Sequence, residues 1–312
     1  MKIIREILQS DPFIQDPPVL IDIGASEEIN PEWKTIAPYS VCVAFDADDR
    51  DFQIAEHENK IYRKLFTFNR IVTAEKMENP TFFLTSSPYC SSLLEPDNES
   101  LKPWLFSPLF KIDREIKLQA ITLVEAFSQI KIGYVDWFKT DSQGTDLRLF
   151  KSIPAHISES VLAAQFEPGI INAYKGEDKL YSILKEMDRP DFWLSYLDVR
   201  GTQRLNHGYE KQISRYVNKG IIRKSPGWAE IIFLRQPVKN KRKLLLLYIF
   251  ALLQKQYGYA LEVADFGMTE LRDEIFQECK VAVLKKIRAE KAKLPLIIGK
   301  RKFNKLFSNI ND

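Results

Sequence analysis

Short apolar runs alternate with helix-like segments along most of the chain, and this pattern predicts an α/β fold. The strongest run is VLIDI, residues 19–23, which is followed by Gly24, Ala25 and Ser26. An apolar stretch of this length with a small-residue exit is typical of a buried central strand in a parallel sheet. Together with six further runs it predicts a doubly wound, seven-stranded sheet. The predicted strands are 19–24, 40–46, 61–67, 134–140, 161–167, 192–198 and 229–235.

The helix start at Asn30 and the strand at residues 40–46 together predict a nucleoside-binding arrangement. Asn30 can cap a first helical turn, and Pro31 suits the first helical position because its missing N–H would have no partner there. The second strand, 40–46, then ends in acid at Asp46 and Asp48. A strand, a small-residue turn, a helix and a second strand with a terminal carboxylate together hold adenosine-bearing cofactors, and Asp46 is placed to accept the ribose hydroxyls.

The charge of the first turn favours one cofactor over another. A dinucleotide places its pyrophosphate against a glycine-rich turn and a helix N-terminus. Here the third glycine of that fingerprint is missing, and Glu27 and Glu28 lie close to the expected phosphates. S-adenosylmethionine (SAM) has no phosphate and carries a sulfonium and an ammonium, which carboxylates attract. The sequence therefore predicts SAM, with an NAD-dependent Rossmann oxidoreductase as the weaker alternative.

A second polar turn follows the predicted strand 134–140. Asp141, Gln143 and Gly144 cluster at its exit, and Asp146 begins the next helix at the end where an acid is favourable. In doubly wound sheets ligands bind outside the carboxyl ends of the strands, and this turn is expected beside the first one. The sequence therefore predicts a functional turn, with a helix-capping role as the alternative for Asp141.

The connection between residues 69 and 133 is too long for a plain loop. It contains PTFFLTSSPYCSSLLEPD, whose turn residues and aromatic side chains predict a hairpin or lid over the cofactor. The alternative is a surface excursion stabilised by Phe82, Phe83 and Tyr89.

Composition narrows the class of protein. The chain has 312 residues, of which 45% are hydrophobic and 28% are charged, as in ordinary globular proteins. Cys42, Cys90 and Cys279 form neither a disulfide framework nor a zinc pair, which fits a reducing compartment. The N-terminus does not resemble a signal peptide, and the longest apolar run is too short to span a membrane. We therefore expect a cytoplasmic protein, and the net charge of +3 gives no case for nucleic acid.

The C-terminal part is more basic than the rest. From Gln236 to Asp312 there are 16 Lys and Arg residues against 8 Asp and Glu residues, in a sequence that reads as helical. Such a tail can contact an anionic membrane or a phosphorylated carrier. A run of charge is more often the solvated face of packed helices, and we expect that role here.

Four stretches resemble the FkbM-like family, a branch of the class I SAM-dependent methyltransferases. They are VLIDIGAS with Trp33 and FDAD, SSPYCSSL, VDWFKTDSQGTDLRLFKSI, and AAQFEPGIINAYKGEDKLYSIL. KTDSQGTDLRLFKSI is the most specific element, and GWAEIIFLR looks like the closing strand of the family. The resemblance covers about residues 19 to 235. It implies a Rossmann-like methyltransferase domain at 19–238, preceded by a helix and Pro-rich lead-in at 1–18 and followed by a basic helical extension at 239–312.

The resemblance also implies SAM as the cofactor and O-methylation of a hydroxyl on a sugar, glycan or secondary metabolite. The cofactor-binding residues implied by the motif matches are Asp22, Gly24, Ala25, Ser26, Asp46, Ser91, Ser92, Gln143 and Gly144. The first three would lie along the methionine and adenosine cleft, and Ser26 lies where the family's loop usually has its second glycine. Asp46 would take the ribose, and the last four would lie near the donor. Because the second glycine of the SAM loop is absent, a methyltransferase-like binding module without activity is an alternative.

Methyl transfer to an alkyl hydroxyl needs an aligned, dry donor and a base for the hydroxyl proton. Asp141, at the exit of one predicted strand, is the first candidate for the base. Glu167, at the exit of the next, is the second. These two acids would also suit a magnesium ion, but nothing in their spacing demands one, and we expect no metal.

Overall fold

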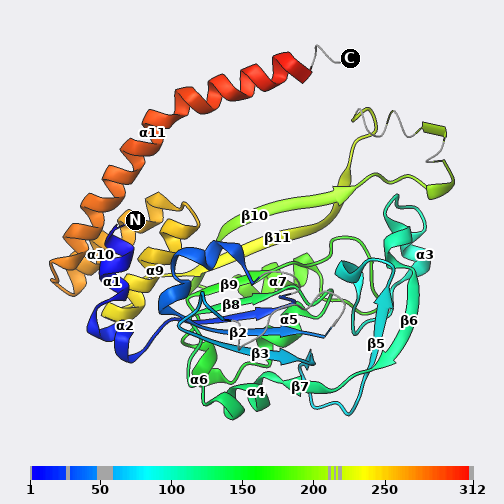
Figure 1. Cartoon of the computed structure of the whole chain (residues 1–312), viewed down its shortest axis with the longest axis horizontal. Coiled ribbons are helices and arrows are strands. Elements are labelled where there is room, and N and C mark those ends of the chain that lie inside the picture. Colours follow the sequence, from blue (N-terminus) through cyan, green and yellow to red (C-terminus); the bar gives the residue numbers. More distant parts are fainter. Residues whose placement is uncertain are drawn as a thin grey trace. The chain divides into compact units, whose positions relative to one another are not determined.

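The computed structural model describes residues 2–25, 29–47, 59–209, 212–213, 216 and 220–308, with side chains up to Lys291 except that of His207. The chain forms two compact units (Figure 1). One comprises residues 8–236, and the other combines residues 1–7 with 237–312. The domain boundaries expected near residues 18 and 238 stay a prediction.

A seven-stranded sheet forms the centre of the unit 8–236. Its strands are β1 (Val19–Ile23), β2 (Val41–Asp46), β3 (Lys64–Asn69), β8 (Trp137–Thr140), β9 (Ala163–Phe166), β10 (Phe192–Thr202) and β11 (Ser225–Arg235). They are arranged in the order β10-β11-β9-β8-β1-β2-β3. All neighbours from β3 to β9 pair in parallel, whereas β11 is antiparallel to both β9 and β10. This is the doubly wound, Rossmann-like order of class I methyltransferases, and the predicted fold class is confirmed.

Each predicted strand is present, but several boundaries differ, and β8 begins at Trp137 rather than at residue 134. The third strand begins at Lys64 rather than at residue 61 because Asn59 holds a turn, in which its Oδ1 accepts the N–H groups of Ile61 and Tyr62 at 3.2 and 2.9 Å. The last two strands pair with each other as far as Thr202 and Ser225, well beyond the predicted limits. Periodicity ended these strands too early because their outer parts are exposed and not uniformly apolar.

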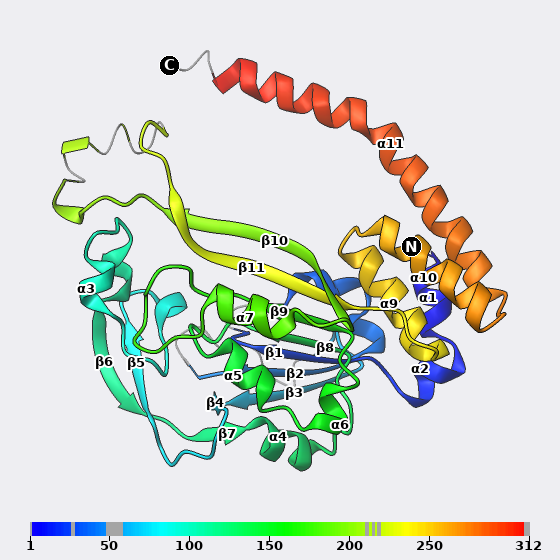
Figure 2. The ribbon, with the colours of Figure 1, turned by 180° about the vertical axis from the view of Figure 1, so that it is seen from behind.

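One face of the sheet packs against four helices (Figure 2). These are α4 (Leu123–Ile130), α5 (Asp146–Lys151), α6 (Ala155–Ser158) and α7 (Leu180–Met187). Alternate strand residues such as Ile21, Val43 and Phe138 meet Phe150 and Ile183 from the helices in one buried cluster. This core fixes the carboxyl ends of the central strands, where the polar turns lie.

The opposite face of the sheet is covered near β1 by η1 (Pro31–Thr35). Its Trp33 packs edge-on against Trp137 of β8, with ring centroids 5.8 Å apart. The Asn30 side chain accepts the N–H of Glu32, so the predicted cap is confirmed. The segment is a 3₁₀ helix rather than an α-helix.

The N-terminal lead-in is more helical than predicted. After α1 (Lys2–Leu8) a second helix, α2, spans Asp11–Gln15. The proline at position 12 does not prevent this, because it lies in the first turn, where its missing N–H breaks no helical hydrogen bond.

The long connection forms two small sheets beside the main one. β4 (Ile71–Thr73) pairs in parallel with β7 (Ala120–Thr122), and β5 (Thr81–Thr85) pairs antiparallel with β6 (Ile112–Lys117). Between β5 and β6 the chain makes η4 (Pro88–Cys90), α3 (Asn98–Leu101) and η5 (Ser107–Phe110). The expected hairpin is therefore an antiparallel pair with a long excursion between its strands.

The second unit is helical, as predicted. It contains α9 (Lys241–Leu253), α10 (Tyr257–Glu270) and α11 (Ile275–Ser308). Residues 244–252 of α9 are all buried, as expected of a helix that is apolar on every side. None of the helices in the described part of the chain has the length and apolarity needed to cross a membrane.

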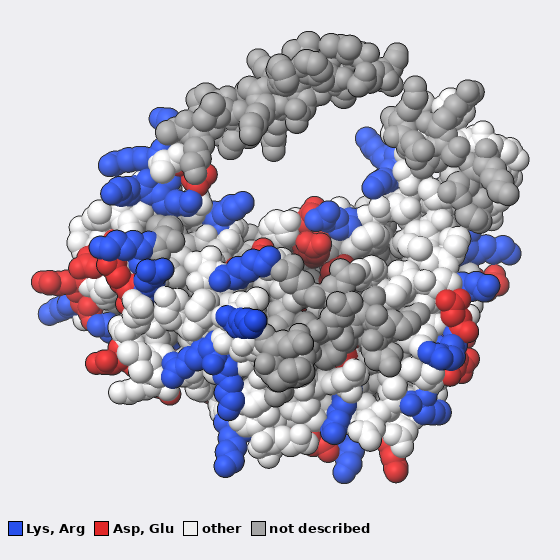
Figure 3. All heavy atoms as spheres, in the orientation of Figure 1, with Lys and Arg blue, Asp and Glu red and all other residues white. Residues whose placement is uncertain are grey.

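Basic and acidic side chains are mixed on the described part of this unit (Figure 3). Four of its lysines form ion pairs with carboxylates: Lys239 with Glu270, Lys241 with Asp273, Lys280 with Asp265, and Lys286 with Glu290. These pairs reduce the local excess of positive charge. The solvated role expected for the basic face stays a prediction, with contact to a membrane or a phosphorylated carrier as the alternative.

Candidate active site

Two adjoining cavities lie at the carboxyl ends of β1, β2, β8 and β9. The first is lined by Gly24, Asp46 and Ser91 among others, and the second by Glu167 and Trp228 among others. Both are lined by Tyr89, Asp141 and Gln143. The first cavity encloses about 100 Å³ and the second about 390 Å³. Ligand pockets usually measure roughly 300–1,000 Å³, so an adenosine-sized ligand needs more room than the first cavity gives in this structure.

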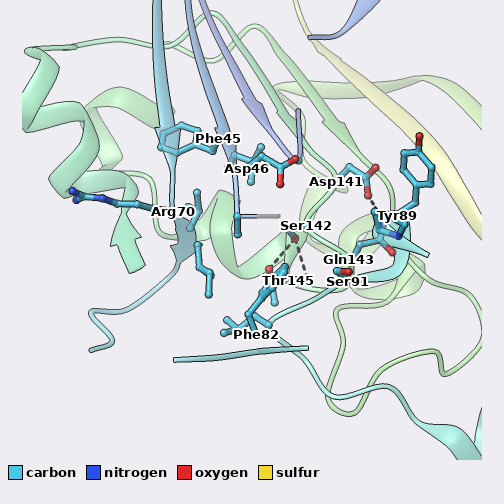
Figure 4. Close-up of a pocket in the computed structure, with 17 residues that line it drawn as sticks. Phe45, Asp46, Arg70, Phe82, Tyr89, Ser91, Asp141, Ser142, Gln143 and Thr145 are labelled. Carbon is cyan, nitrogen blue, oxygen red and sulfur yellow. Dashed lines mark hydrogen bonds between the residues drawn. The ribbon is translucent and has the colours of Figure 1, made fainter. Parts of the chain in front are cut away.

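Gly24 allows the carboxyl ends of β1, β2 and β8 to approach one another closely. Its φ is +80°, and a Cβ atom there would overlap the carbonyl oxygen of Asp141. The N–H groups of Gly24 and Ala25 both donate to the carbonyl of Phe45, at 2.9 and 3.1 Å. The chain therefore turns sharply away after β1 and leaves the first cavity open next to Asp46 (Figure 4).

Asp146 joins the exits of β8 and β9. Its Oδ1 accepts the N–H of Ser142 at 2.9 Å, and its Oδ2 accepts the N–H of Glu167 at 3.0 Å. The N-cap position of α5 belongs to Thr145, without a side-chain cap. The alternative role of Asp141 as a helix cap is therefore wrong, and Asp146 is the acid that organises this turn.

The Asp141 carboxylate is held by a chain of polar groups. Gln143, in a left-handed conformation with φ of +55°, donates from Nε2 to Asp141 Oδ1 at 2.6 Å. The Tyr174 hydroxyl lies 2.9 Å from Gln143 Oε1 and 2.9 Å from the carbonyl oxygen of Cys90. Ser92 Oγ donates to the Gln143 carbonyl at 2.8 Å. Figure 4 shows Gln143 and Tyr89 beside Asp141.

The two acids proposed as bases titrate differently. Burial raises the pKa of Asp141 to about 6. The charge of Asp141, followed by burial, raises the pKa of Glu167 to about 9. At neutral pH Asp141 is mainly ionised and Glu167 carries a proton. A general base works best with a pKa near the operating pH, so Asp141 suits this role better.

The walls of the second cavity are aromatic and acidic. Phe106 stacks on Trp228 with centroids 6.1 Å apart, and Phe110 packs edge-on against both Phe106 and Tyr174. Three acids line the cavity, and none of its described lining residues is a Lys or Arg. Glu177 is one of these acids. Its Oε1 accepts the N–H of Ala173 at 2.6 Å and pairs with Lys179 Nζ at 2.7 Å.

Most of the predicted site residues lie together, but some do not reach the cavities. Those on the first cavity are Gly24, Asp46, Ser91, Asp141 and Gln143, and those on the second are Asp141, Gln143, Gly144 and Glu167. Ser92 is buried and holds Gln143 instead. Ser26 lies outside the described residues.

Asp22 and Ala25 are buried and line neither cavity. Asp22 Oδ1 pairs with Lys139 Nζ at 2.6 Å, and Asp22 Oδ2 accepts the N–H of Asn30 at 2.8 Å. Successive residues of a strand face opposite sides of the sheet. Ile23 therefore lines the first cavity, whereas the neighbouring Asp22 faces Asn30 and Lys139 on the other side.

Sequence reasoning did not select Tyr174, which connects Gln143 to the cavity wall. It lies inside the motif AAQFEPGIINAYKGEDKLYSIL, but an isolated tyrosine among turn residues gives no signal of its own. Among the residues with described side chains, no group of three or more His, Cys, Asp or Glu is arranged to hold a metal ion.

No family model matches the chain, and no curated protein matches it. Among solved structures, a chain of a fibrillarin/Nop5p complex aligns over 70% of this chain and 73% of its own, with 11% identity and a TM-score of 0.33. A SAM-dependent methyltransferase from Mesorhizobium loti aligns over 70% and 90%, with 9% identity and a TM-score of 0.30. The StiE O-MT aligns over 82% and 80%, with 8% identity and a TM-score of 0.32. The fold is identified by the strand order and pairing rather than by these overlays.

Proposed function

We propose that the chain is a SAM-dependent methyltransferase that transfers a methyl group to a hydroxyl of a small molecule such as a sugar, a glycan unit or a secondary metabolite. The observation that carries this proposal is the meeting of two cavities at one acid, Asp141, at the carboxyl ends of a sheet with class I methyltransferase order. Membership of the FkbM-like family remains part of the proposal.

The first cavity is our candidate for the donor site, although it must widen to admit an adenosine-sized ligand. Asp46, at the end of the strand next to β1, is placed to accept ribose hydroxyls. Gly24, which lines the same cavity, allows the backbone after β1 to lie against the carbonyl oxygen of Asp141. When bound, SAM supplies a methyl group on a positively charged sulfonium, and the Asp141 carboxylate on the shared wall favours that charge.

The second cavity fits the acceptor. A hydroxyl placed there beside Asp141 can give its proton to the carboxylate while its oxygen receives the methyl group. Gln143 fixes the orientation of that carboxylate, and the surrounding aromatic rings exclude water. The catalytic contribution of the chain is thus alignment, exclusion of water and acceptance of one proton at Asp141.

The proposal is tested by calorimetric titration of the full chain with S-adenosylhomocysteine (SAH) and, separately, with NADH. We expect SAH to bind and NADH not to bind. Asp46→Asn should weaken SAH binding by about tenfold, because a charge-assisted hydrogen bond to the ribose is lost. Asp188→Asn, at an exposed acid outside both cavities, is the matched control and should change nothing.

Absence of heat with SAH, or binding of NADH alone, would overturn the proposal. Binding of SAH without transfer of label from SAM to any compound in a screen of hydroxylated acceptors would favour a binding module without activity.

A further inference from the structure

Glu167 differs from the other buried acids around the two cavities. Asp22 is paired with Lys139, Glu177 with Lys179, and Asp146 with backbone N–H groups. No described residue donates a hydrogen bond or forms an ion pair with the Glu167 carboxyl group, which lines the second cavity. This half-buried carboxyl group can therefore form an ion pair with a cationic ligand without breaking an existing ion pair or hydrogen bond.

The charges that face Glu167 are mainly negative. They come from Asp141 after β8, Asp146 in α5 and Glu230 in β11, and the one cation among them is Lys139 in β8. That lysine already forms an ion pair with Asp22. In the ligand-free protein a proton relieves the excess, because the nearby Asp141 charge and burial raise the pKa of Glu167 to about 9.

The walls near this acid also suit a cation. Trp228 and Phe106 present a stacked aromatic pair, and Tyr89 stands on the wall between the two cavities. Aromatic faces attract ammonium groups, particularly where water is excluded. A phosphate or carboxylate in the same space would meet three acids and no lining Lys or Arg among the described residues.

We propose that the acceptor carries an ammonium group, which Glu167 and the aromatic wall of the second cavity receive while the reacting hydroxyl lies at Asp141. This inference rests on the proposed function, since it assigns the acceptor class of the same site. The expected acceptors are amino alcohols, including amino sugars and phenolic amines, and anionic acceptors are excluded.

The test uses two series of compounds that differ only in charge: tyramine, tyrosol and 4-hydroxyphenylacetate, and glucosamine, glucose and glucuronate. Each is titrated calorimetrically into the full chain saturated with SAH. In at least one series the amine should bind about tenfold more tightly than the neutral compound, and the acid should not bind. Titrations in buffers of different ionisation enthalpy should show release of up to about one proton per amine bound, because the ammonium displaces the proton of Glu167.

Glu167→Gln keeps the shape of the side chain and removes its charge. It should reduce the affinity for the amine to that for the neutral compound, and change the affinity for the neutral compound by no more than about twofold. Glu230→Gln, at a neighbouring acid outside the cavity lining, is the matched control and should keep the preference. Thermal unfolding and SAH binding of both variants establish that they are folded.

Equal binding of amine and neutral compounds, an unchanged preference in Glu167→Gln, or no binding of either amine would overturn the inference. The titrations are repeated with sinefungin, which has an ammonium group where SAM has its sulfonium. If the preference for the amine disappeared with sinefungin, the donor rather than the acceptor would supply the positive charge that balances the acids. That result would also overturn the inference. Failure of SAH to bind is a separate result and counts against the proposed function itself.

Discussion

Asp22 and Asp141 come from neighbouring parallel strands, yet their surroundings differ. Asp22 lies within β1, where Lys139 and the N–H of Asn30 occupy both of its oxygens. Asp141 lies one residue beyond β8, on the wall shared by the two cavities, with Gln143 bonded to one oxygen. An acid inside the end of a buried strand therefore holds the sheet together, whereas an acid just past the end is available for chemistry.

The largest effect is expected from Asp141→Asn. Loss of the base should reduce methyl transfer by about 10²- to 10⁴-fold and leave SAH binding within a few-fold. In the wild type the rate should rise with pH and level off above about 6, because Asp141 must be ionised to accept a proton. The measurement is transfer of label from SAM to an amine accepted in the titrations above.

Asp188→Asn serves again as the control for this experiment and should transfer label at the wild-type rate. Full activity of Asp141→Asn would show that the comparison between the two acids is misplaced.

Asp22→Asn should reduce the free energy of unfolding by about 3 kcal/mol, because it removes the ion-pair partner of the partly buried Lys139 ammonium. The measurement is urea unfolding at neutral pH. The double variant Asp22→Asn with Lys139→Met should recover part of the loss, since no unpaired charge remains.

If Asp22→Asn alone had wild-type stability but did not bind SAH, the structural role that we assign to Asp22 would be wrong. In that case Asp22 would belong to the cofactor site as the sequence implied.

The last effect is the pH dependence of stability that Glu167 causes. Its pKa is raised in the folded state from an ordinary value of 4.5, so the folded protein keeps a proton that the unfolded chain has lost. The contribution of this group to stability is therefore complete below pH 4.5 and is lost as pH rises toward 9. Glu167→Gln does not titrate, so it should be similar to the wild type in stability at pH 4 and clearly more stable than the wild type at pH 8.

Urea unfolding of both proteins across this pH range measures the difference. If the free energies of unfolding of the two proteins changed in parallel with pH, the pKa of Glu167 would not be raised by its acidic neighbours.

The sheet could be predicted from sequence because apolar runs of strand length alternate with helical patterns. The turn after β8 could also be predicted, since Asp141 and Gln143 follow an apolar run directly. What the pattern could not show was the direction of individual side chains. Asp22 and Gly24 are two residues apart, yet only Gly24 reaches the cavity, because the backbone turns sharply between the strand and the glycine.

The second cavity could not be predicted as a unit. Its walls come from segments far apart in the chain, including Phe106, Tyr174 and Trp228. Nothing local to any of these residues specifies that they meet. The pairing of Asp22 with Lys139 likewise depends on strand register, which places these two residues opposite each other.

The Tyr174 hydroxyl lies equally far from the amide oxygen of Gln143 and the carbonyl of Cys90, and this position gives the site two hydrogen-bond arrangements. With Asp141 ionised, the amide donates to it and Tyr174 donates to the amide oxygen. With Asp141 protonated, a half-turn of the amide reverses the first link: the acid donates to the amide oxygen, the amide nitrogen donates to Tyr174, and Tyr174 donates to Cys90. The site can thus hold the proton of each turnover while Asp141, Gln143 and Tyr174 stay hydrogen-bonded to one another.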